Sequence, residues 1–201
     1  MIGYIIIIVV SYLLGNISTS YIIAKKMLGV DIRTQGSGNA GSTNALRVLG
    51  KKAGAMTFIG DLLKGMIAVF IAKVVANIIN VDTTTAAYIA VVFVVAGHNW
   101  PALLGFKGGK GVATSLGAMI AVNPIMALSC FGIFLVIVAI TKYVSLGAIV
   151  GISCSPIMMI VFKNNKGLIA TLFLTISVIY THRENIKRLL NGTERKLGEK
   201  K

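Results

Sequence analysis

Apolar stretches separated by short polar links run along almost the whole chain. Most of them are close to the roughly 20 residues that an α-helix needs to cross a bilayer core. This pattern predicts helices embedded in a membrane. The predicted helices are residues 2–24, 53–79, 84–104, 112–122, 125–140, 144–162 and 167–180.

The composition agrees with a membrane protein. Of the 201 residues, 56% are hydrophobic and only 13% are charged, and the mean hydropathy is +0.85. A typical soluble domain has about 25% charged residues. The sequence contains neither an internal repeat nor a linker that would separate a second domain. We therefore expect an all-α, polytopic membrane protein with a single domain over residues 1–201.

The distribution of charge predicts the topology. Basic residues on short loops are typical of the cytoplasmic side, and here they gather in residues 25–52 and in the tail after residue 180. The short stretch 112–122 either crosses the membrane or dips in and returns; only a crossing places the tail on the same side as the basic loop. We expect seven transmembrane helices, some short, with the N-terminus outside and the C-terminus cytoplasmic. Lys163 and Lys166, on an outer link, are an exception to the charge rule.

The net charge of +14 does not need a nucleic-acid partner, because the cytoplasmic loops of a membrane protein account for it and no DNA- or RNA-binding motif is present. Metal ligation is not indicated either. Cys130 and Cys154 lie inside apolar stretches, and no Cys/His spacing typical of zinc occurs. With six acidic residues in all, the chain offers no paired carboxylates for glycosidase chemistry and no multi-aspartate metal site.

A run of small and hydroxylated residues fills the first basic loop, between Thr34 and Arg47. Glycine allows backbone N–H groups to turn towards a common point, where they form an anion-binding concavity. An arginine can grip phosphate oxygens with two parallel hydrogen bonds. A flexible connection between helices is the alternative interpretation of such a sequence. The candidate phosphate ligands in this loop are Ser37, Gly38, Asn39, Thr43, Asn44 and Arg47.

A second loop of this kind precedes the stretch 112–122. It combines two lysines and three glycines just before a predicted helix, where free N–H groups favour anions. It is not a nucleotide-binding Walker A loop, because Gly111 follows Lys110 where Ser or Thr would be required. ATP is therefore not implied. The candidate phosphate ligands in this loop are Lys107, Gly108, Gly109 and Lys110.

Further polar residues have two interpretations each. Asp61 and Lys64 are three residues apart inside an apolar helix and can form an ion pair. Ionisable residues at such a depth either take part in function or stabilise the structure. We expect this pair to support the fold. His98 is either a site residue or a hydrogen-bonded histidine at a helix end. His182 and Asn185 share one face of a basic helix that continues past the last apolar stretch, and we expect a site role over a simple lipid-headgroup anchor.

The two loops and the basic helix would bring cations and N–H donors together next to the lipid bilayer. Such a site suits a phosphorylated substrate that reacts with a lipid or an acyl chain. A transporter for an anionic solute is the rival class, but it would be expected to show an inverted repeat and a site near the middle of the membrane.

Three motifs in order resemble those of the bacterial acyl-phosphate-dependent glycerol-3-phosphate acyltransferases. The resemblance covers essentially the whole chain; one departure is Ala40-Gly41-Ser42, where the family usually has Pro or Ile, Gly and Ala. The motifs are Ser37-Gly38-Asn39 with Thr43-Asn44 and Arg47, then Gly97-His98 with residues 106–114, and then His182-Arg183-Glu184-Asn185-Ile186 with Arg188-Leu189 and Gly192 and Glu194.

The resemblance implies transfer of a fatty acyl group from acyl phosphate to the 1-hydroxyl of glycerol 3-phosphate, which gives lysophosphatidic acid and phosphate, the first acylation step of phospholipid biosynthesis. It implies a bacterial inner-membrane enzyme with a cytoplasmic active site, without cofactor or metal and without need for ATP, coenzyme A or acyl carrier protein; we expect a monomer. The residues expected to take part directly in catalysis are Ser37, Lys107, His182 and Asn185, with Ser145 as a further donor to phosphate. Either His182 or the phosphate of glycerol 3-phosphate itself would accept the hydroxyl proton.

Overall fold

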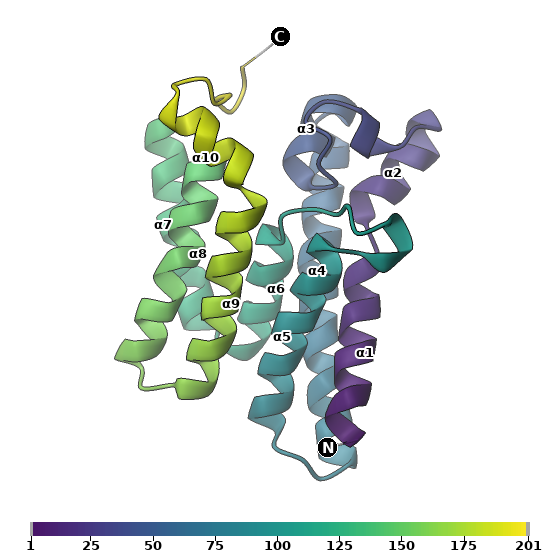
Figure 1. The fold of residues 1–201 in the computed structure, drawn as a ribbon, viewed down its shortest axis with the longest axis vertical. Coiled ribbons are helices and arrows are strands. Elements are labelled where there is room, and N and C mark those ends of the chain that lie inside the picture. Colours follow the sequence, from purple (N-terminus) through teal and green to yellow (C-terminus); the bar gives the residue numbers. More distant parts are fainter. Residues whose placement is uncertain (1, 200–201) are drawn as a thin grey trace. The chain divides into compact units, whose positions relative to one another are not determined.

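The computed structural model describes residues 2–199, and all the regular elements in that range are helices (Figure 1). The all-α prediction is confirmed for this part of the chain. Contacts divide it into two compact units, the first ending at Val122 and the second beginning at Asn123.

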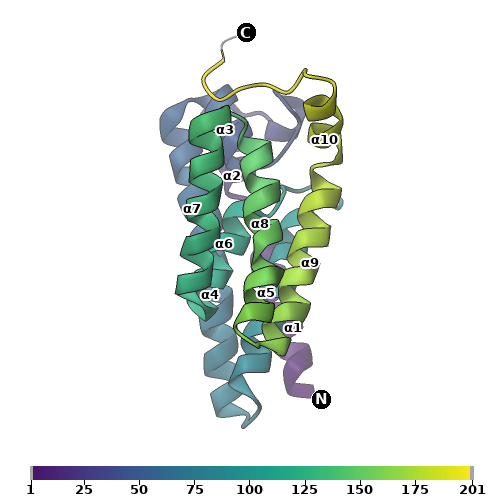
Figure 2. The same cartoon turned by 90° about the vertical axis from the view of Figure 1, so that its left-hand side faces the viewer.

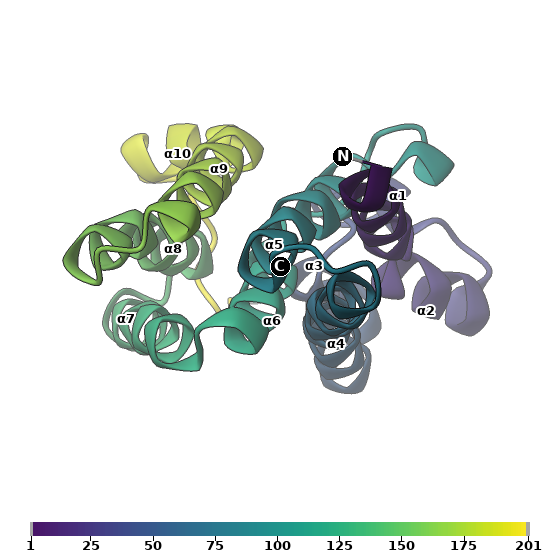
Figure 3. The same cartoon turned by 90° about the horizontal axis from the view of Figure 1, so that it is seen from below.

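The first unit is built on two long helix pairs, in which α1 packs along α5 and α6 packs along α4 (Figures 1 and 3). The backbones of α1 and α5 come so close that a side chain at Gly97 would clash with the carbonyl of Tyr12. The elements of this unit are α1 (Ile2–Asn16), α2 (Thr19–Leu28), η1 (Ile32–Thr34), α3 (Ser42–Leu49), α4 (Lys51–Ile78), α5 (Thr83–Asn99), η2 (Ala102–Leu104) and α6 (Val112–Val122).

The first apolar stretch is not one uninterrupted helix, as residues 2–24 were predicted to be. It divides into α1 and α2 at Ile17 and Ser18. The side chain of Asn16 turns back to the carbonyl of Tyr12 at 2.7 Å, and Ser18 caps α2 by accepting from the N–H of Tyr21. Such side chains compete with the helical backbone bonds. Asn16 and Ser18 are both buried, so these polar side chains point into the protein.

Part of the first glycine-rich segment is also helical, where the sequence was interpreted as loop throughout. Helix α3 begins at Ser42, so Ser42, Thr43 and Asn44 form its first turn and Arg47 lies in its last turn. The segment before it is held by the buried side chains of Ile32 and Ala40. The candidate phosphate ligands of this segment are thus divided between a glycine-rich turn, the first turn of α3 and its last turn.

The second unit consists of three helices joined by short links and a fourth, short helix at the end (Figure 2). Gly151 of α8 faces α7 closely: a Cβ there would lie 3.0 Å from the carbonyl of Cys130, so a small residue at this position allows the two helices to approach. The elements are α7 (Pro124–Thr141), α8 (Val144–Val161), α9 (Asn165–Thr181) and α10 (Arg183–Leu190).

Among the described residues, four segments are long and apolar enough to cross a membrane. They are Gly3–Leu28, Thr83–Leu104, Pro124–Thr141 and Val144–Val161, and α6 and α9 are apolar but shorter. Helix α6 has the same bounds as the predicted stretch 112–122. Helix α4 is 28 residues long and carries three ionisable residues in its interior, Asp61, Lys64 and Lys73.

Candidate active site

Asn44 determines the shape of the first glycine-rich turn. Its side-chain oxygen accepts a hydrogen bond from the N–H of Ser37 at 2.8 Å. Its amide group donates to the carbonyls of Ile32 and Gln35 at 3.2 and 3.0 Å. Because Gly36 and Gly38 adopt positive φ angles of 60° and 72°, the chain can turn tightly around this buried side chain. The polar groups of Asn44 are therefore used to hold the turn, on which Ser37 and Gly38 lie exposed.

The two glycine-rich loops meet through their backbones. The N–H of Ala40 in the first loop donates to the carbonyl of Gly108 in the second at 3.4 Å. Arg33 adds a side-chain bridge, because its guanidinium donates to the carbonyls of Leu104 and Lys107. From the sequence, Arg33 had no expected role beyond loop charge, and only the structure reveals its partners.

Asp31 holds Arg33 in place. The carboxylate oxygen Oδ2 lies 2.7 Å from Nη2 of Arg33, and the Nε of Arg33 also donates to the same carboxylate. The hydrogen bonds from Arg33 lower the pKa of Asp31 below its usual value, and the same pair raises the pKa of Arg33. The ion pair thus persists across neutral pH and keeps the bridge between the loops intact.

The second glycine-rich loop lies directly on the C-terminal end of α5. The N–H groups of Gly108 and Gly109 donate to the carbonyls of Asn99 and His98 at 3.2 and 3.0 Å. A side chain at Gly109 would collide with the imidazole of His98 and come within 3.0 Å of the carbonyl of Ala40. Glycine is required here by the close approach of three segments.

The cationic candidates of the first unit are displayed on these elements. Lys107 is exposed and Lys110 half-buried on the second loop, and Arg47 is exposed at the end of α3. Asn39 and Thr43 are half-buried beside the exposed Ser37 and Gly38. The structure therefore joins the two predicted loops into one polar region of hydroxyls, side-chain amides and cations. The N–H groups of Ser37, Gly38, Gly108 and Gly109, expected to face an anion, donate to acceptors within the protein instead. Oxyanions of phosphate are the ligands that such donors and cations suit.

The second unit gathers its polar residues around Glu194. One oxygen of this carboxylate accepts from Ser145 at 2.8 Å and from Asn185 at 2.6 Å. The other accepts from the Nε of Arg188 at 2.7 Å. Burial acts to raise the pKa of Glu194, but these hydrogen bonds outweigh it and hold the pKa below its usual value. Glu194 was noticed in the sequence only as part of a motif; its position nine residues after Asn185 gave no sign of this role.

His182 lies at the junction of α9 and α10. It was predicted to sit on one helix continuing past the membrane; instead α9 ends at Thr181 and α10 begins at Arg183. The ring atom Nδ1 lies 2.9 Å from the carbonyl of Val178, and the hydroxyl of Thr181 donates to Ser177 at 2.8 Å. In a neutral ring, Nδ1 carries the proton that this contact needs, so Nε2 has the lone pair. His182 and Asn185 are both buried.

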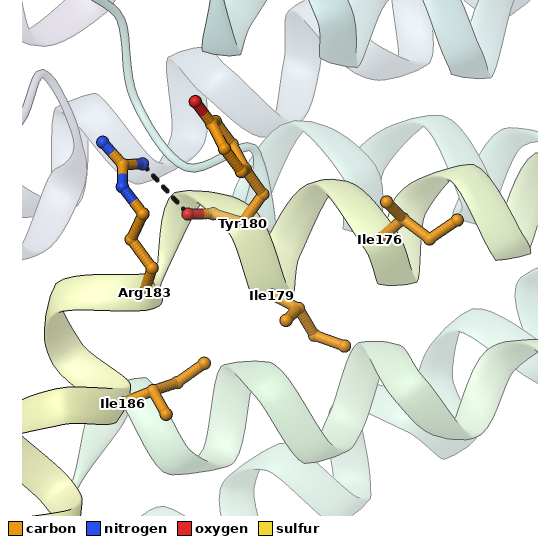
Figure 4. Close-up of a pocket in the computed structure, with 5 residues that line it drawn as sticks. All are labelled: Ile176, Ile179, Tyr180, Arg183 and Ile186. Atoms are coloured by element: carbon orange, nitrogen blue, oxygen red, sulfur yellow. Dashed lines mark hydrogen bonds between the residues drawn. The ribbon is translucent and has the colours of Figure 1, made fainter.

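A shallow apolar groove of about 450 Å³ runs beside this junction (Figure 4). Ile176, Ile179 and Ile186 form its walls, and Arg183 stands next to Tyr180, whose carbonyl accepts from its guanidinium at 3.1 Å. The guanidinium also lies over the Tyr180 ring, 4.6 Å from its centre.

The predicted pair of Asp61 and Lys64 is confirmed, with 2.9 Å between Lys64 Nζ and the carboxylate. His98 is a buried, hydrogen-bonded histidine whose Nδ1 lies 2.8 Å from the same ammonium group. Within residues 2–199 no cluster of three or more His, Cys, Asp or Glu side chains is suited to hold a metal ion.

Comparison with known proteins identifies the family. The model of the glycerol-3-phosphate acyltransferase family matches residues 5–192. The chain belongs to this family. A glycerol-3-phosphate acyltransferase of Clostridioides difficile (strain 630) is 71% identical over 199 residues, which cover 99% of this chain and 98% of the relative. One from Alkaliphilus metalliredigens (strain QYMF) is 46% identical over 97% of this chain and 96% of its own length.

Solved structures of this acyltransferase family have the same fold. PlsY (YgiH), an integral membrane glycerol 3-phosphate acyltransferase, superposes in its glycerol 3-phosphate form with a TM-score of 0.88 at 40% identity, over 97% of this chain and 96% of that one. Its lysphosphatidic acid form gives a TM-score of 0.84 at 38% identity, over 97% and 95%. The chain described here is accordingly an integral membrane protein of the glycerol-3-phosphate acyltransferase family.

Proposed function

We propose that this protein transfers a fatty acyl group from acyl phosphate to the 1-hydroxyl of glycerol 3-phosphate. The hydroxyl oxygen attacks the acyl carbon, a new ester bond forms, and the bond between the acyl carbon and the phosphate oxygen breaks. The products are lysophosphatidic acid and inorganic phosphate. The hydroxyl proton leaves on a phosphate group, so that atoms and charge balance without a cofactor.

The junction of the two glycine-rich loops carries this proposal. Two loops that carry hydroxyl and cationic side chains are joined by the hydrogen bond from Ala40 to Gly108. Ser37 and Lys107 thereby belong to one polar region. Both proposed substrates and one product are phosphorylated. Acyl phosphate is already activated, so the protein mainly has to orient two phosphorylated molecules and stabilise charge. The two forms of the PlsY relative, with glycerol 3-phosphate and with lysphosphatidic acid, agree with this substrate and product pair.

Each candidate residue receives a role in the reaction. The cations Arg47, Lys107 and Lys110 neutralise phosphate oxygens. Side-chain donors of the first unit fix their orientation; these are Ser37, Asn39 and Thr43. Gly38, Gly108 and Gly109 contribute the tight turn and the close packing that place these groups, since their N–H groups donate to carbonyls of the protein. Asn44 contributes by holding the turn on which Ser37 lies.

In the second unit, Asn185 serves as a donor to phosphate with one amide hydrogen while the other holds it to Glu194. Ser145 has a single hydroxyl hydrogen, which Glu194 accepts here, and it donates to phosphate once that hydrogen turns from the carboxylate to the substrate. In the bound ground state His182 Nε2 accepts a hydrogen bond from the attacking hydroxyl and orients it. As the hydroxyl reacts, it turns its single proton from Nε2 to the substrate phosphate. The phosphate of glycerol 3-phosphate, whose second pKa is about 6 as in other phosphate monoesters, takes the proton. The partner of His182 Nδ1 is a carbonyl, which orients the ring but stabilises an imidazolium less than a carboxylate would.

The same proposal includes the setting of the enzyme. Seven helices cross the bacterial inner membrane, with the N-terminus outside and with the active site and the C-terminus in the cytoplasm. The chain acts as one acyltransferase domain and as a monomer, and it requires neither ATP, coenzyme A nor acyl carrier protein. The basic residues of the loops and tail support this orientation.

The direct test uses purified protein in detergent with glycerol 3-phosphate and one acyl donor at a time. We expect lysophosphatidic acid and phosphate in equal amounts from acyl phosphate, and no product from acyl-coenzyme A or acyl-acyl carrier protein. Product from a thioester donor alone would overturn the donor assignment. Uptake of glycerol 3-phosphate into proteoliposomes without acyl transfer would favour a transporter instead.

A further inference from the structure

A buried polar cluster of residues that have no assigned role in catalysis lies in the first unit. Its centre is the ammonium group of Lys64, which is 6% exposed. This group lies 2.7 Å from the carbonyl of Ile17, 2.8 Å from His98 Nδ1 and 2.9 Å from Asp61 Oδ1. The same carboxylate oxygen accepts from the hydroxyl of Thr19 at 3.2 Å.

The cluster joins four helices at the point where the first apolar stretch is interrupted. Lys64 and Asp61 belong to α4, His98 to the end of α5, Ile17 follows α1, and Thr19 begins α2. The carbonyls at the end of a helix lack helical partners, and a cation there is favourable. Lys64 supplies that cation to the end of α1 and so stabilises the interruption between α1 and α2.

The contact with Lys64 fixes the orientation and tautomer of the His98 ring. An ammonium group has only donors, so Nδ1 of His98 must accept from it. In the neutral ring, Nε2 then carries the proton. Nε2 is the atom that a side chain at Gly109 would strike, so this edge of the ring lies against the second glycine-rich loop. The carbonyl of His98 also accepts from the N–H of Gly109 at 3.0 Å.

We propose that Asp61 and Lys64 are positioning residues that act through His98, whose ring edge sets the second glycine-rich loop for phosphate binding. The chain of contacts runs from Asp61 to Lys64, from Lys64 to Nδ1, and from the Nε2 edge to Gly109. Lys107 and Lys110 flank Gly108 and Gly109, so a shift of the loop moves both cations. The loop's phosphate-binding role rests on the proposed function.

The principal variant is His98→Asn. Asparagine places an amide oxygen near the position of Nδ1, so Lys64 retains an acceptor, but the ring edge that faces Gly109 is removed. The variant Asp61→Asn/Lys64→Met removes both charges together and keeps His98, which avoids leaving one buried charge unpaired. Lys73→Met is the matched control, since Lys73 also lies on α4 and donates to a backbone carbonyl, that of Ala121 at 2.6 Å, outside both glycine-rich loops.

Three measurements on the purified full chain distinguish positioning from simple packing. The first is the Kd for glycerol 3-phosphate and for inorganic phosphate. The second is hydrogen exchange of the amides in residues 105–115. The third is the kinetics of acyl transfer, namely kcat and the KM values for acyl phosphate and for glycerol 3-phosphate.

We expect His98→Asn to weaken phosphate binding by about tenfold or more, because a displaced loop misaligns its cations, and to speed amide exchange at Gly108 and Gly109. One KM should rise much more than the other, with a smaller change in kcat. The charge-removing double variant should shift the same quantities in the same direction, and Lys73→Met should change them less than about twofold.

Unchanged binding and exchange in both variants, or a fall in thermal stability alone, would show that the cluster only packs the helices. If Lys73→Met changed binding and exchange as much as the two cluster variants do, the cluster would likewise be shown only to pack the helices. If the wild-type protein binds phosphate, with weaker binding in His98→Asn, but transfers no acyl group, the positioning role stands and the proposed reaction fails. If the wild-type protein binds neither glycerol 3-phosphate nor inorganic phosphate, the loop has no phosphate-binding role and the positioning role fails as well.

Discussion

Replacing Glu194 by Gln should loosen the end of the second unit. The carboxylate accepts from Ser145, Asn185 and Arg188 at 2.8, 2.6 and 2.7 Å. In the Glu194→Gln variant one of the two acceptor oxygens becomes an NH₂ group, so at least one donor faces another donor. Hydrogen bonds to a charged group contribute roughly 1.5–3 kcal/mol, and an unsatisfied buried donor costs about 1–3 kcal/mol.

We expect a loss of about 3 kcal/mol in the free energy of unfolding. For a chain of this length each kcal/mol shifts Tm by roughly 2–4 °C, so Tm should fall by about 6–12 °C. The two cysteines, Cys130 and Cys154, are unpaired and lie in α7 and α8. A dye that becomes fluorescent on reaction with thiols therefore reports the unfolding of the second unit specifically.

Glu184→Gln is the matched control for this measurement. Glu184 forms an ion pair with Lys187 at 3.3 Å, but the two side chains are 59% and 70% exposed. Exposed ion pairs contribute little to the free energy of unfolding, about 0.5 kcal/mol or less. Its Tm should stay within roughly 2 °C of wild type. Equal shifts for the two variants, or no shift for Glu194→Gln, would refute the assignment of Glu194 as the organising acceptor.

The pH dependence gives a second check on the same residue. The pKa of Glu194 is lowered in the folded protein, so its stabilisation is fully present above the unfolded value of about 4.3. This stabilisation is lost as the pH falls through the pKa that Glu194 has in the folded protein, which is the lower of the two. The Tm difference between wild type and Glu194→Gln should therefore be constant near neutral pH and shrink in acid, below about pH 4.

Three other substitutions test the site. Asn44→Ala should lower the free energy of unfolding by about 2–4 kcal/mol and expose the first loop to proteolysis, because three backbone groups lose their partner; an unchanged digestion pattern would contradict this. Gly109→Ala should reduce kcat/KM by about a hundredfold or more because a side chain collides with His98, whereas Gly132→Ala, with open space at its Cβ, should leave activity intact; similar activities would argue against the packed loop. His182→Gln should lower kcat but leave the shape of the pH–rate profile unchanged if the substrate phosphate takes the proton, and the loss of one limb would assign the base to His182.

The local features of the fold were predictable because they depend on periodicity and spacing. An apolar run between Gly111 and Asn123 fixed the bounds of α6. The separation of three residues placed Asp61 and Lys64 on one face of a helix, and the structure confirms their pairing. The glycine-rich turns were predictable for a similar reason, although the start of α3 at Ser42 inside the first segment was not. Their anion-binding role stays a prediction.

The remaining features depend on partners that are distant in sequence. Arg33 reaches the carbonyl of Lys107, 74 positions away, and Ser145 reaches Glu194, 49 positions away. No local pattern indicates which distant group a polar side chain will meet. The interruption at Ile17 was missed for the same reason, because the cation that stabilises it comes from Lys64.

A double-mutant cycle between the two loops tests the central claim most directly. Ser37→Ala, Lys107→Met and the combined variant are compared by kcat/KM for acyl transfer from acyl phosphate to glycerol 3-phosphate. If the joined loops form one phosphate-binding site, the combined loss will fall short of the sum of the single losses by about 1 kcal/mol or more. Losses that add within about 0.3 kcal/mol would show that the two loops act independently, which would contradict the account.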